Sequence, residues 1–354
     1  MRQELRFCTA PDGVRLAYAL SGHGAPLVKA GNWMTHLERD WTSPVWRHWL
    51  TALGAEQTVV RYDERGSGLS DRQYPSLSFD DWVSDLETVV NAADIDRFTL
   101  LGLSQGGPIA IAYAARHPER VSRLVLYGTF ARGRRHRRNG QEAEEEAAAL
   151  IALTRAGWGR RNPAFRRLFT MLFIPGGSEA QMSWFDELQQ VSCSPDHAAR
   201  SRAARYDLDV RALASTLDVP TLVMHARDDA LVPFEEGRHL ASLIPAAHFV
   251  SLDSANHILL EDEPAWAEFC SELRTFLPAF TPSTDADLAS LTGREHQILD
   301  LVAAGRTNQS IASTLHLSVR TVERHLSNCY SKLGITGRTA RAAAAARFAT
   351  HSRE

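Results

Sequence analysis

The chain has 354 residues, of which 44% are hydrophobic and 23% are charged, and this composition excludes a disordered, fibrous or collagen-like protein. The net charge of −3 is unevenly spread: residues 290–354 carry nine Lys or Arg against four Asp or Glu, a net +5, which leaves −8 for residues 1–289. We therefore expect a large acidic domain and a small basic one that binds a polyanion, because Lys and Arg gain affinity by releasing counterions from phosphate backbones.

The sequence offers no sign of a membrane or a metal. No apolar stretch approaches the roughly 20 residues that span a bilayer, and no export signal follows Met1. The four cysteines lie far apart, without the close pairs of a zinc site or the density of a disulfide scaffold. We expect a cytoplasmic protein with free thiols, no metal and no other cofactor.

Apolar runs typical of buried strands alternate with helical patterns through the first 280 residues. Continuous apolar strands separated by helices favour an α/β fold with a mostly parallel sheet covered on both faces. The expected helices are residues 79–92, 107–116 and 266–276. The expected strands are residues 27–31, 58–63, 98–103, 123–128, 220–226 and 248–253.

This alternation stops at residues 129–206, which combine helix formers with scattered large apolar side chains and predict a helical cap inserted over the sheet. A basic run at residues 131–140 precedes an acidic one at 142–146; two solvated faces that partly neutralise each other are favoured over an accessory nucleic-acid contact. Residues 281–288, rich in Pro, Ser, Thr and Asp, predict a short linker.

The segment Gly102-Leu103-Ser104-Gln105-Gly106 lies between an expected strand and an expected helix. Glycines two residues either side of a serine permit a strained strand-to-helix turn in which a Cβ would clash with backbone. Such a turn exposes the serine at the carboxyl edge of the sheet. Because a serine hydroxyl is a poor nucleophile at neutral pH, it needs a histidine base and a carboxylate that orients it.

Candidates for both partners follow later strands, in the order serine, acid, histidine. Asp228 and Asp229 come just after residues 220–226, and His257 comes after residues 248–253. Taken singly, an Asp after a strand is usually a turn former and a His a surface or core residue. Three such groups, each at a strand end and in this order, favour a catalytic triad.

With these motifs in place, residues 1–280 resemble the α/β-hydrolase superfamily, and residues 62–70 match its D-x-R-G-x-G-x-S loop. The resemblance implies a doubly wound sheet with a helical cap. It also implies that Ser104 is the nucleophile, His257 the base and Asp229, rather than Asp228, the orienting acid.

The same resemblance implies that the backbone N–H groups of Asn32 and Gln105 form an oxyanion hole. The chain departs from the family at Ala30, where many members have His. The substrate is not implied. Large apolar residues favour a pocket for a hydrophobic small molecule or acyl chain, with plain core as the alternative; the residues expected to line it are Trp33, Met171, Phe173 and Trp184.

Residues 289–354 predict a separate domain of short helices. Thr292 and Glu295 form a capping box at the first, Thr307 caps the second and Ser318 the third, which Gly334 ends. Apolar residues recur along one face of the third helix at helical spacing. Its polar residues, which we expect to contact DNA in the major groove, are Arg320, Thr321, Glu323, Arg324, Ser327 and Lys332.

Residues 291–334 resemble the LuxR-type helix-turn-helix domain across all four helices. The resemblance implies a two-fold DNA-binding module, with residues 309–317 as the scaffold helix and turn and residues 318–333 as the recognition helix. Family members often have a basic residue where this chain has Glu323. A helical bundle that binds protein is the alternative.

Together these features predict a homodimeric transcriptional regulator that binds double-stranded operator DNA and whose hydrolase-like domain binds, and can hydrolyse, a hydrophobic ligand. The alternative is an active serine esterase or lactonase, tethered to DNA, that degrades its own signal. Regulation is favoured because catalysis gains nothing evident from binding an operator.

Overall fold

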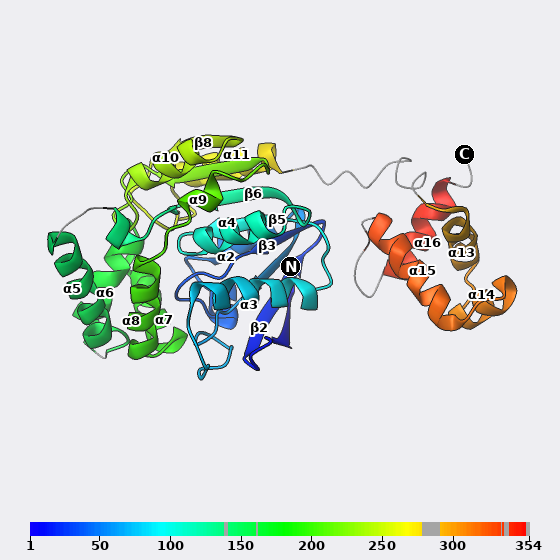
Figure 1. Cartoon of the computed structure of the whole chain (residues 1–354), viewed down its shortest axis with the longest axis horizontal. Helices are drawn as coiled ribbons and strands as arrows, with labels where there is room; N and C mark the ends of the chain where they lie inside the picture. Colours follow the sequence, from blue (N-terminus) through cyan, green and yellow to red (C-terminus); the bar gives the residue numbers. More distant parts are fainter. Residues whose placement is uncertain (138–140, 161, 278–290, 334, 336–339, 352–354) are drawn as a thin grey trace. The chain divides into compact units, whose positions relative to one another are not determined.

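The computed structural model describes residues 1–137, 141–160, 162–277, 291–333, 335 and 340–351. The chain divides into two compact units, Met1–Pro278 and Ala279–Glu354 (Figure 1). The predicted linker, residues 281–288, lies outside the described residues.

The N-terminal unit is built on one eight-stranded sheet with the order β1-β2-β4-β3-β5-β6-β7-β8. The first two strands pair antiparallel with each other, β2 also pairs antiparallel with β4, and all other neighbours are parallel. The predicted mostly parallel α/β sheet is therefore confirmed. The strands are β1 (Gln3–Thr9), β2 (Arg15–Gly22), β3 (Ala25–Lys29), β4 (Gln57–Tyr62), β5 (Phe98–Leu103), β6 (Val121–Tyr127), β7 (Thr221–Ala226) and β8 (Ala247–Leu252).

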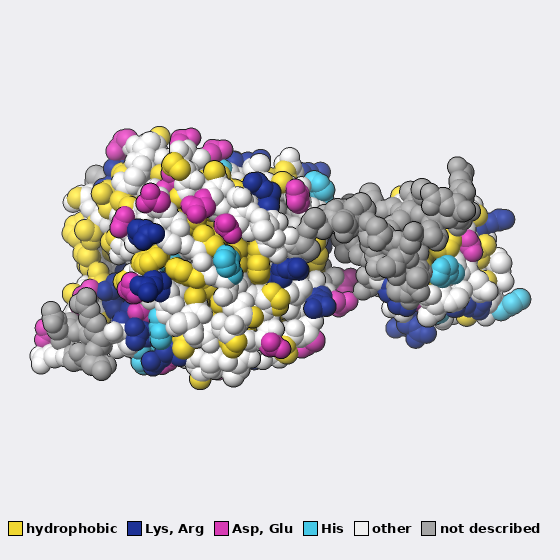
Figure 2. Space-filling view, turned by 90° about the horizontal axis from the view of Figure 1, so that it is seen from above, with side chains coloured by type: hydrophobic (Ala, Val, Ile, Leu, Met, Phe, Trp, Pro, Cys, Tyr) yellow, Lys and Arg dark blue, Asp and Glu magenta, His cyan; other side chains and the backbone are white. Residues whose placement is uncertain are grey.

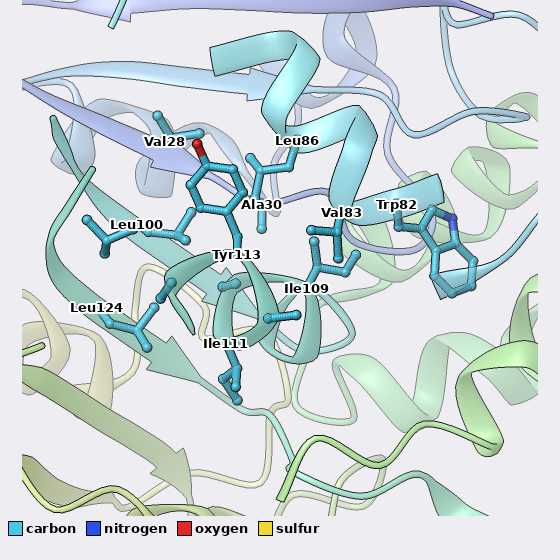
Figure 3. Packing of buried hydrophobic residues seen from close by; sticks show 14 of the residues in the cluster. Val28, Ala30, Trp82, Val83, Leu86, Leu100, Ile109, Ile111, Tyr113 and Leu124 are labelled. Atoms are coloured by element: carbon cyan, nitrogen blue, oxygen red, sulfur yellow. The ribbon is translucent and has the colours of Figure 1, made fainter. Parts of the chain in front are cut away.

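Helices cover both faces of this sheet. On one face, α3 (Phe79–Ala92) and α4 (Gly106–Arg116) pack against the central strands; Figure 3 shows Leu86 and Tyr113 beside Val28 and Leu100. The other face carries a second apolar cluster. With both faces covered, every residue of β5 is buried, and all but Thr99 lack a polar side chain. The remaining helices around the sheet are α1 (Leu37–Trp41), α2 (Arg47–Leu53), α9 (Arg211–Ala214), α10 (Phe234–Leu243) and α11 (Pro264–Phe276).

A helical cap follows β6, seen in green in Figure 1. It consists of η1 (Arg134–His136), α5 (Gln141–Gly157), α6 (Pro163–Phe173), α7 (Glu179–Ser192) and α8 (Pro195–Tyr206). The basic run at its start contacts the acidic run: Arg134 lies 2.7 Å from Glu146, and Arg135 lies 2.7 Å from Glu144. These pairs agree with the interpretation of two mutually neutralising faces.

A buried ion pair joins the cap to the sheet. Arg205 of α8 donates from Nη2 to both carboxylate oxygens of Glu64, each at 2.7 Å, and Glu64 lies in the loop after β4. The Arg205 guanidinium also lies 3.9 Å from the ring centroid of Trp82 in α3. Close by, Arg72 donates to the carbonyl oxygens of Val191 and Ser192 at the end of α7. These contacts fix α7 and α8 to the core.

The C-terminal unit contains α13 (Gly293–Ala303), α14 (Asn308–Leu315), α15 (Val319–Lys332) and α16 (Ala340–His351). The capping box of Thr292 and Glu295 and the cap at Thr307 are both present. His316 adopts a left-handed conformation that turns the chain between α14 and α15. Gly334, expected to end the third helix, lies outside the described residues. No helix in the described part of the chain is long and apolar enough to cross a membrane.

Candidate active site and DNA-contacting helix

Ser104 lies in the sharp turn from β5 to α4, with φ at +52°. Its glycine neighbours are required by close backbone contacts. A Cβ at Gly102 would lie 2.8 Å from Cα of Gly107, and one at Gly106 would lie 2.8 Å from the carbonyl oxygen of Gly31. A non-glycine residue in this conformation costs about 1–3 kcal/mol, so the surrounding packing must hold the serine in place.

Three side chains from three strand ends meet at this turn. Oγ of Ser104 lies 2.8 Å from Nε2 of His257, and Nδ1 of His257 lies 2.6 Å from Oδ2 of Asp229. All three residues are buried. With Nδ1–H donating to Asp229, Nε2 is left to accept the serine proton, which is the arrangement that general-base activation requires.

The structure distinguishes the two adjacent carboxylates. Oδ1 of Asp229 accepts from the backbone N–H groups of Leu231 and Val232, at 2.8 and 2.9 Å, so its side chain is oriented toward the histidine. Asp228 is exposed to solvent. The acid expected from the resemblance is therefore the one that contacts His257.

A second buried histidine, which the sequence reasoning missed, lies beside the acid. Nε2 of His225 lies 3.5 Å from Oδ2 of Asp229 and 2.9 Å from the carbonyl oxygen of Val232. Burial lowers the pKa of His225, with the Asp229 carboxylate opposing the shift. The sequence signal that could have identified His225 was its place near the end of an apolar strand, four residues before Asp229.

The expected oxyanion donors flank the turn. Among the described residues, neither the N–H of Gln105 nor that of Asn32 donates to a turn or loop carbonyl or to a side chain. The Asn32 side chain accepts a hydrogen bond from Nζ of the buried Lys29 and donates to the carbonyl oxygen of Trp33. Lys29, which sequence reasoning also missed, thus helps to hold the loop that carries Asn32.

A cavity of about 220 Å³ adjoins these three loops. Its lining includes the residues that directly follow the proposed functional groups: Trp33 after Asn32, Gln105 after Ser104, and residues 230–232 after Asp229. The cap supplies the remaining wall, from Leu150, Leu172, Arg202, Arg205 and Tyr206 among others. The cavity therefore adjoins the loops that carry Asn32, Ser104 and Asp229, at the carboxyl ends of the strands, although Ser104 and His257 are not among its lining residues.

Of the four expected pocket residues, Trp33 alone is among the lining residues of this cavity. The ring of Phe173 lies 5.6 Å from that of His257. Met171 is 44% exposed, because the helical period of α6 turns it outward. Trp184, next to the buried Phe185 in α7, lines a separate surface groove with Arg39 and Arg166.

Helix α15 of the C-terminal unit has one buried and one exposed face. Its apolar positions, Val322, Leu326 and Cys329, are at most 3% exposed. The expected DNA-contacting residues Arg320, Glu323, Arg324 and Ser327 are exposed. Figure 2 shows Lys and Arg side chains on the surface of this unit.

The other two expected contacts also serve the unit itself. Oγ1 of Thr321 lies 2.7 Å from Oγ of Ser318, at the start of α15. Nζ of Lys332 donates to Glu295 of α13 at 2.8 Å. Burial of Glu295 opposes its ionisation, but the hydrogen bonds from Lys332 and Thr292 lower its pKa.

Comparison with known families matches both units. Residues 23–264 match the model described as "alpha/beta hydrolase fold", and residues 289–345 match "Bacterial regulatory proteins, luxR family".

Individual relatives match the first unit. A pyrrolizixenacetamide deacetylase from Xenorhabdus hominickii is 28% identical over 74% of this chain and 94% of its own length. A 2-hydroxymuconate semialdehyde hydrolase from Pseudomonas sp. (strain CF600) is 29% identical over 69% of this chain and 84% of its own. Among solved structures, an esterase from Exiguobacterium antarcticum is 26% identical, with a TM-score of 0.63 over 76% of this chain and 98% of that one.

Proposed function

Because the chain belongs to the α/β-hydrolase family and carries a luxR-family regulatory domain at its C-terminal end, we propose that it is a ligand-responsive transcriptional regulator. Its C-terminal unit binds operator DNA, and its N-terminal unit binds a small apolar ligand, which it can hydrolyse. The observation that carries this proposal is the combination of an exposed arginine face on α15 with a cavity beside Ser104.

The proposed DNA contact rests on the exposed face of α15. Arg320 and Arg324 are suited to bind guanine edges in the major groove, and Ser327 is suited to bind a base or a phosphate. The homodimer that the luxR family implies would place two such helices on two half-sites. A regulator bound to the chromosome acts in the cytoplasm, and we propose that location on this ground alone.

The proposed chemistry is acyl transfer. Oγ of Ser104 attacks the carbonyl carbon of an ester, lactone or amide while Nε2 of His257 takes the hydroxyl proton. The N–H groups of Asn32 and Gln105 donate to the oxyanion. His257 returns the proton to the leaving group, and water then cleaves the acyl-serine by the same steps. The hydrolase and deacetylase names of the relatives support this class of reaction.

The three hydrogen-bonded side chains also favour a second candidate, an esterase or lactonase that degrades its own signal. The two candidates differ in what Ser104→Ala does to regulation. Full-length wild type and variant are compared for operator affinity, using duplexes selected from a random pool and a ligand identified by native mass spectrometry of the purified protein. A sensor keeps its ligand-dependent change in operator affinity without the serine hydroxyl. A signal-degrading enzyme has no such dependence in either form.

Coupling between ligand and operator must be reciprocal. A ligand can change operator affinity only if it binds two states of the protein with different affinities, typically by about 1–3 kcal/mol. We propose that the cap is the two-state element and that dimer geometry transmits its state. Calorimetry of the ligand with and without operator DNA must then give the same coupling factor as operator titrations with and without ligand. Ligand affinity that is independent of operator would exclude the sensor.

A further inference from the structure

Arg202 of α8 lines the cavity beside Ser104 and is only 6% exposed. Its Nη1 lies 3.3 Å from the hydroxyl of Tyr206. Its Nε and Nη2 have no hydrogen-bond partner among the described residues. The guanidinium lies 4.4 Å from the ring centroid of Trp33 and 5.3 Å from that of Phe169. These aromatic contacts stabilise a cation but satisfy none of its N–H groups in the ring plane.

The other arginines of this cavity differ from Arg202 in having a carboxylate nearby. Arg205 is paired with Glu64 at 2.7 Å, Arg134 with Glu146 at 2.7 Å, and Arg137 with Glu236 at 4.0 Å. Within the described part of the chain, no carboxylate oxygen lies within 4 Å of the Arg202 nitrogens. A buried cation without a counter-charge is unfavourable, and a ligand anion would offset part of that cost.

The two unpartnered nitrogens are also the pair best suited to a carboxylate. Nε and Nη2 lie along one edge of the guanidinium and point two N–H groups in parallel, which matches the two oxygens of a carboxylate. The same edge binds carboxylates elsewhere in this protein. Arg65 donates to Asp85 from Nε at 2.8 Å and from Nη2 at 2.6 Å. In Arg202, which lines the cavity together with Trp33, Leu150 and Leu172, that edge has almost no accessible surface. A carboxylate therefore reaches it only after the Arg202 side chain or the cap shifts to expose it.

We propose that Arg202 binds a carboxylate carried by the ligand, so that the ligand is a monoacid with an apolar body and a hydrolysable acyl group. The acid end pairs with Nε and Nη2 of Arg202, the body packs against Trp33, Leu150 and Leu172, and the carbonyl lies at Ser104. This inference rests on the proposed function, in which the cavity is the ligand site. It replaces a purely hydrophobic ligand with an amphipathic one.

The test measures binding and needs no turnover. Full-length protein with Ser104→Ala is titrated by calorimetry with monobutyl glutarate and with its neutral counterpart, in which an amide replaces the carboxylate. The acid is expected to bind at least about tenfold more tightly than the amide, as a charge-assisted pair provides. Arg202→Met removes this ratio, because methionine fills similar space without charge. Arg202→Lys restores part of it, since lysine supplies the charge but not the two-donor edge.

Arg200→Met is the matched control. Arg200 is on the same helix, its side chain is 49% exposed, and it does not line the cavity. The acid-to-amide ratio must survive this change. Thermal unfolding of every variant shows whether each protein is folded.

Three results would overturn the inference: equal binding of acid and amide to the parent protein, no measurable binding of the acid, or an equal loss of both affinities in Arg202→Met. The last result assigns Arg202 a structural role. Failure of the proposed function is seen separately. An unreactive Ser104 or a lack of operator binding leaves the acid-to-amide ratio unchanged, whereas a missing ratio beside a reactive Ser104 rejects the carboxylate site alone.

Discussion

Nδ1 of His257 lies 2.6 Å from Oδ2 of Asp229, and both side chains are fully buried. The neighbouring carboxylate of Asp228 is exposed and takes no part in this contact. Two adjacent aspartates therefore provide a matched pair for testing which one orients the base.

Asp229→Asn is expected to lower the hydrolysis rate of a small p-nitrophenyl ester by roughly 10⁴-fold, because the amide no longer holds His257 in the tautomer that accepts the serine proton. Asp228→Asn is expected to leave the rate within about twofold, because the exposed Asp228 side chain does not contact His257. Steady-state kinetics of the two variants and wild type measure the difference. A similar loss in both would mean that the local turn, rather than the carboxylate of Asp229, governs the rate.

Ser104 is expected to react with a small fluorophosphonate, since His257 is placed to take its proton. Wild type becomes labelled and Ser104→Ala does not, as intact-protein mass spectrometry can show. Because Ser104 is only 1% exposed, the labelling rate also reports how often the cap opens. If wild type stays unlabelled after long exposure to the smallest probe, Ser104 is not a nucleophile and the cavity only binds a ligand.

Arg324→Ala is expected to weaken binding to a selected operator by about 1–3 kcal/mol and to relax base preference at one position. Its exposed side chain on α15 is free to approach a base edge. Arg306→Ala removes one exposed charge from the loop before α14. It measures how much DNA affinity is lost when one positive charge is removed without a base contact. Fluorescence anisotropy with operator and random duplexes distinguishes the two; an equal loss on both DNAs for Arg324→Ala would show a phosphate contact only.

His197 is expected to make the N-terminal unit lose stability in acid. Burial, assisted by Arg205, Arg200 and Arg72, lowers the pKa of His197 to about 3, against about 6.5 in an unfolded chain. Between these values the unfolded state binds a proton that the native state does not. The free energy of unfolding therefore falls as pH drops through this window, by up to about 1.4 kcal/mol per pH unit.

Urea unfolding followed by tryptophan fluorescence measures this slope, because all eight tryptophans lie in the first 266 residues. His197→Gln is expected to reduce the slope, and the same change at the exposed His248 is expected to leave it unchanged. If the free energy of unfolding of His197→Gln falls with pH as steeply as that of wild type, other titratable groups cause the loss of stability.

The sequence predicted the parallel strands better than the antiparallel ones. Strands β3 to β7 appear as short apolar runs because helices bury them on both faces. Strand β1 lies at an edge and mixes exposed with half-buried residues, so its pattern is weak. A signal was nonetheless present: Asp12 and Gly13 lie between two strand-like stretches, and Gly13 has φ at +89°.

Motifs in the sequence predicted the three triad residues, whereas the role of Arg202 depends on tertiary contacts that the sequence does not reveal. Ser104, Asp229 and His257 stand at strand ends that local pattern locates. Arg202 could not be singled out, because the helix sequence PDHAARSRAARY offers three arginines and looks exposed. Which of them are buried depends on Trp33, Phe169 and Glu64, which lie far away in sequence.

The Arg205–Glu64 pair has a consequence for engineering chimeras. Glu64 belongs to the loop after β4, whereas its partner belongs to α8, so the two halves of the pair lie 141 positions apart. Grafting a foreign cap onto this sheet would leave Glu64 as a buried carboxylate without its cation, a defect worth about 3–5 kcal/mol. A successful exchange must transfer position 64 together with the cap. In this protein, the segment that can be swapped independently is therefore discontinuous in sequence.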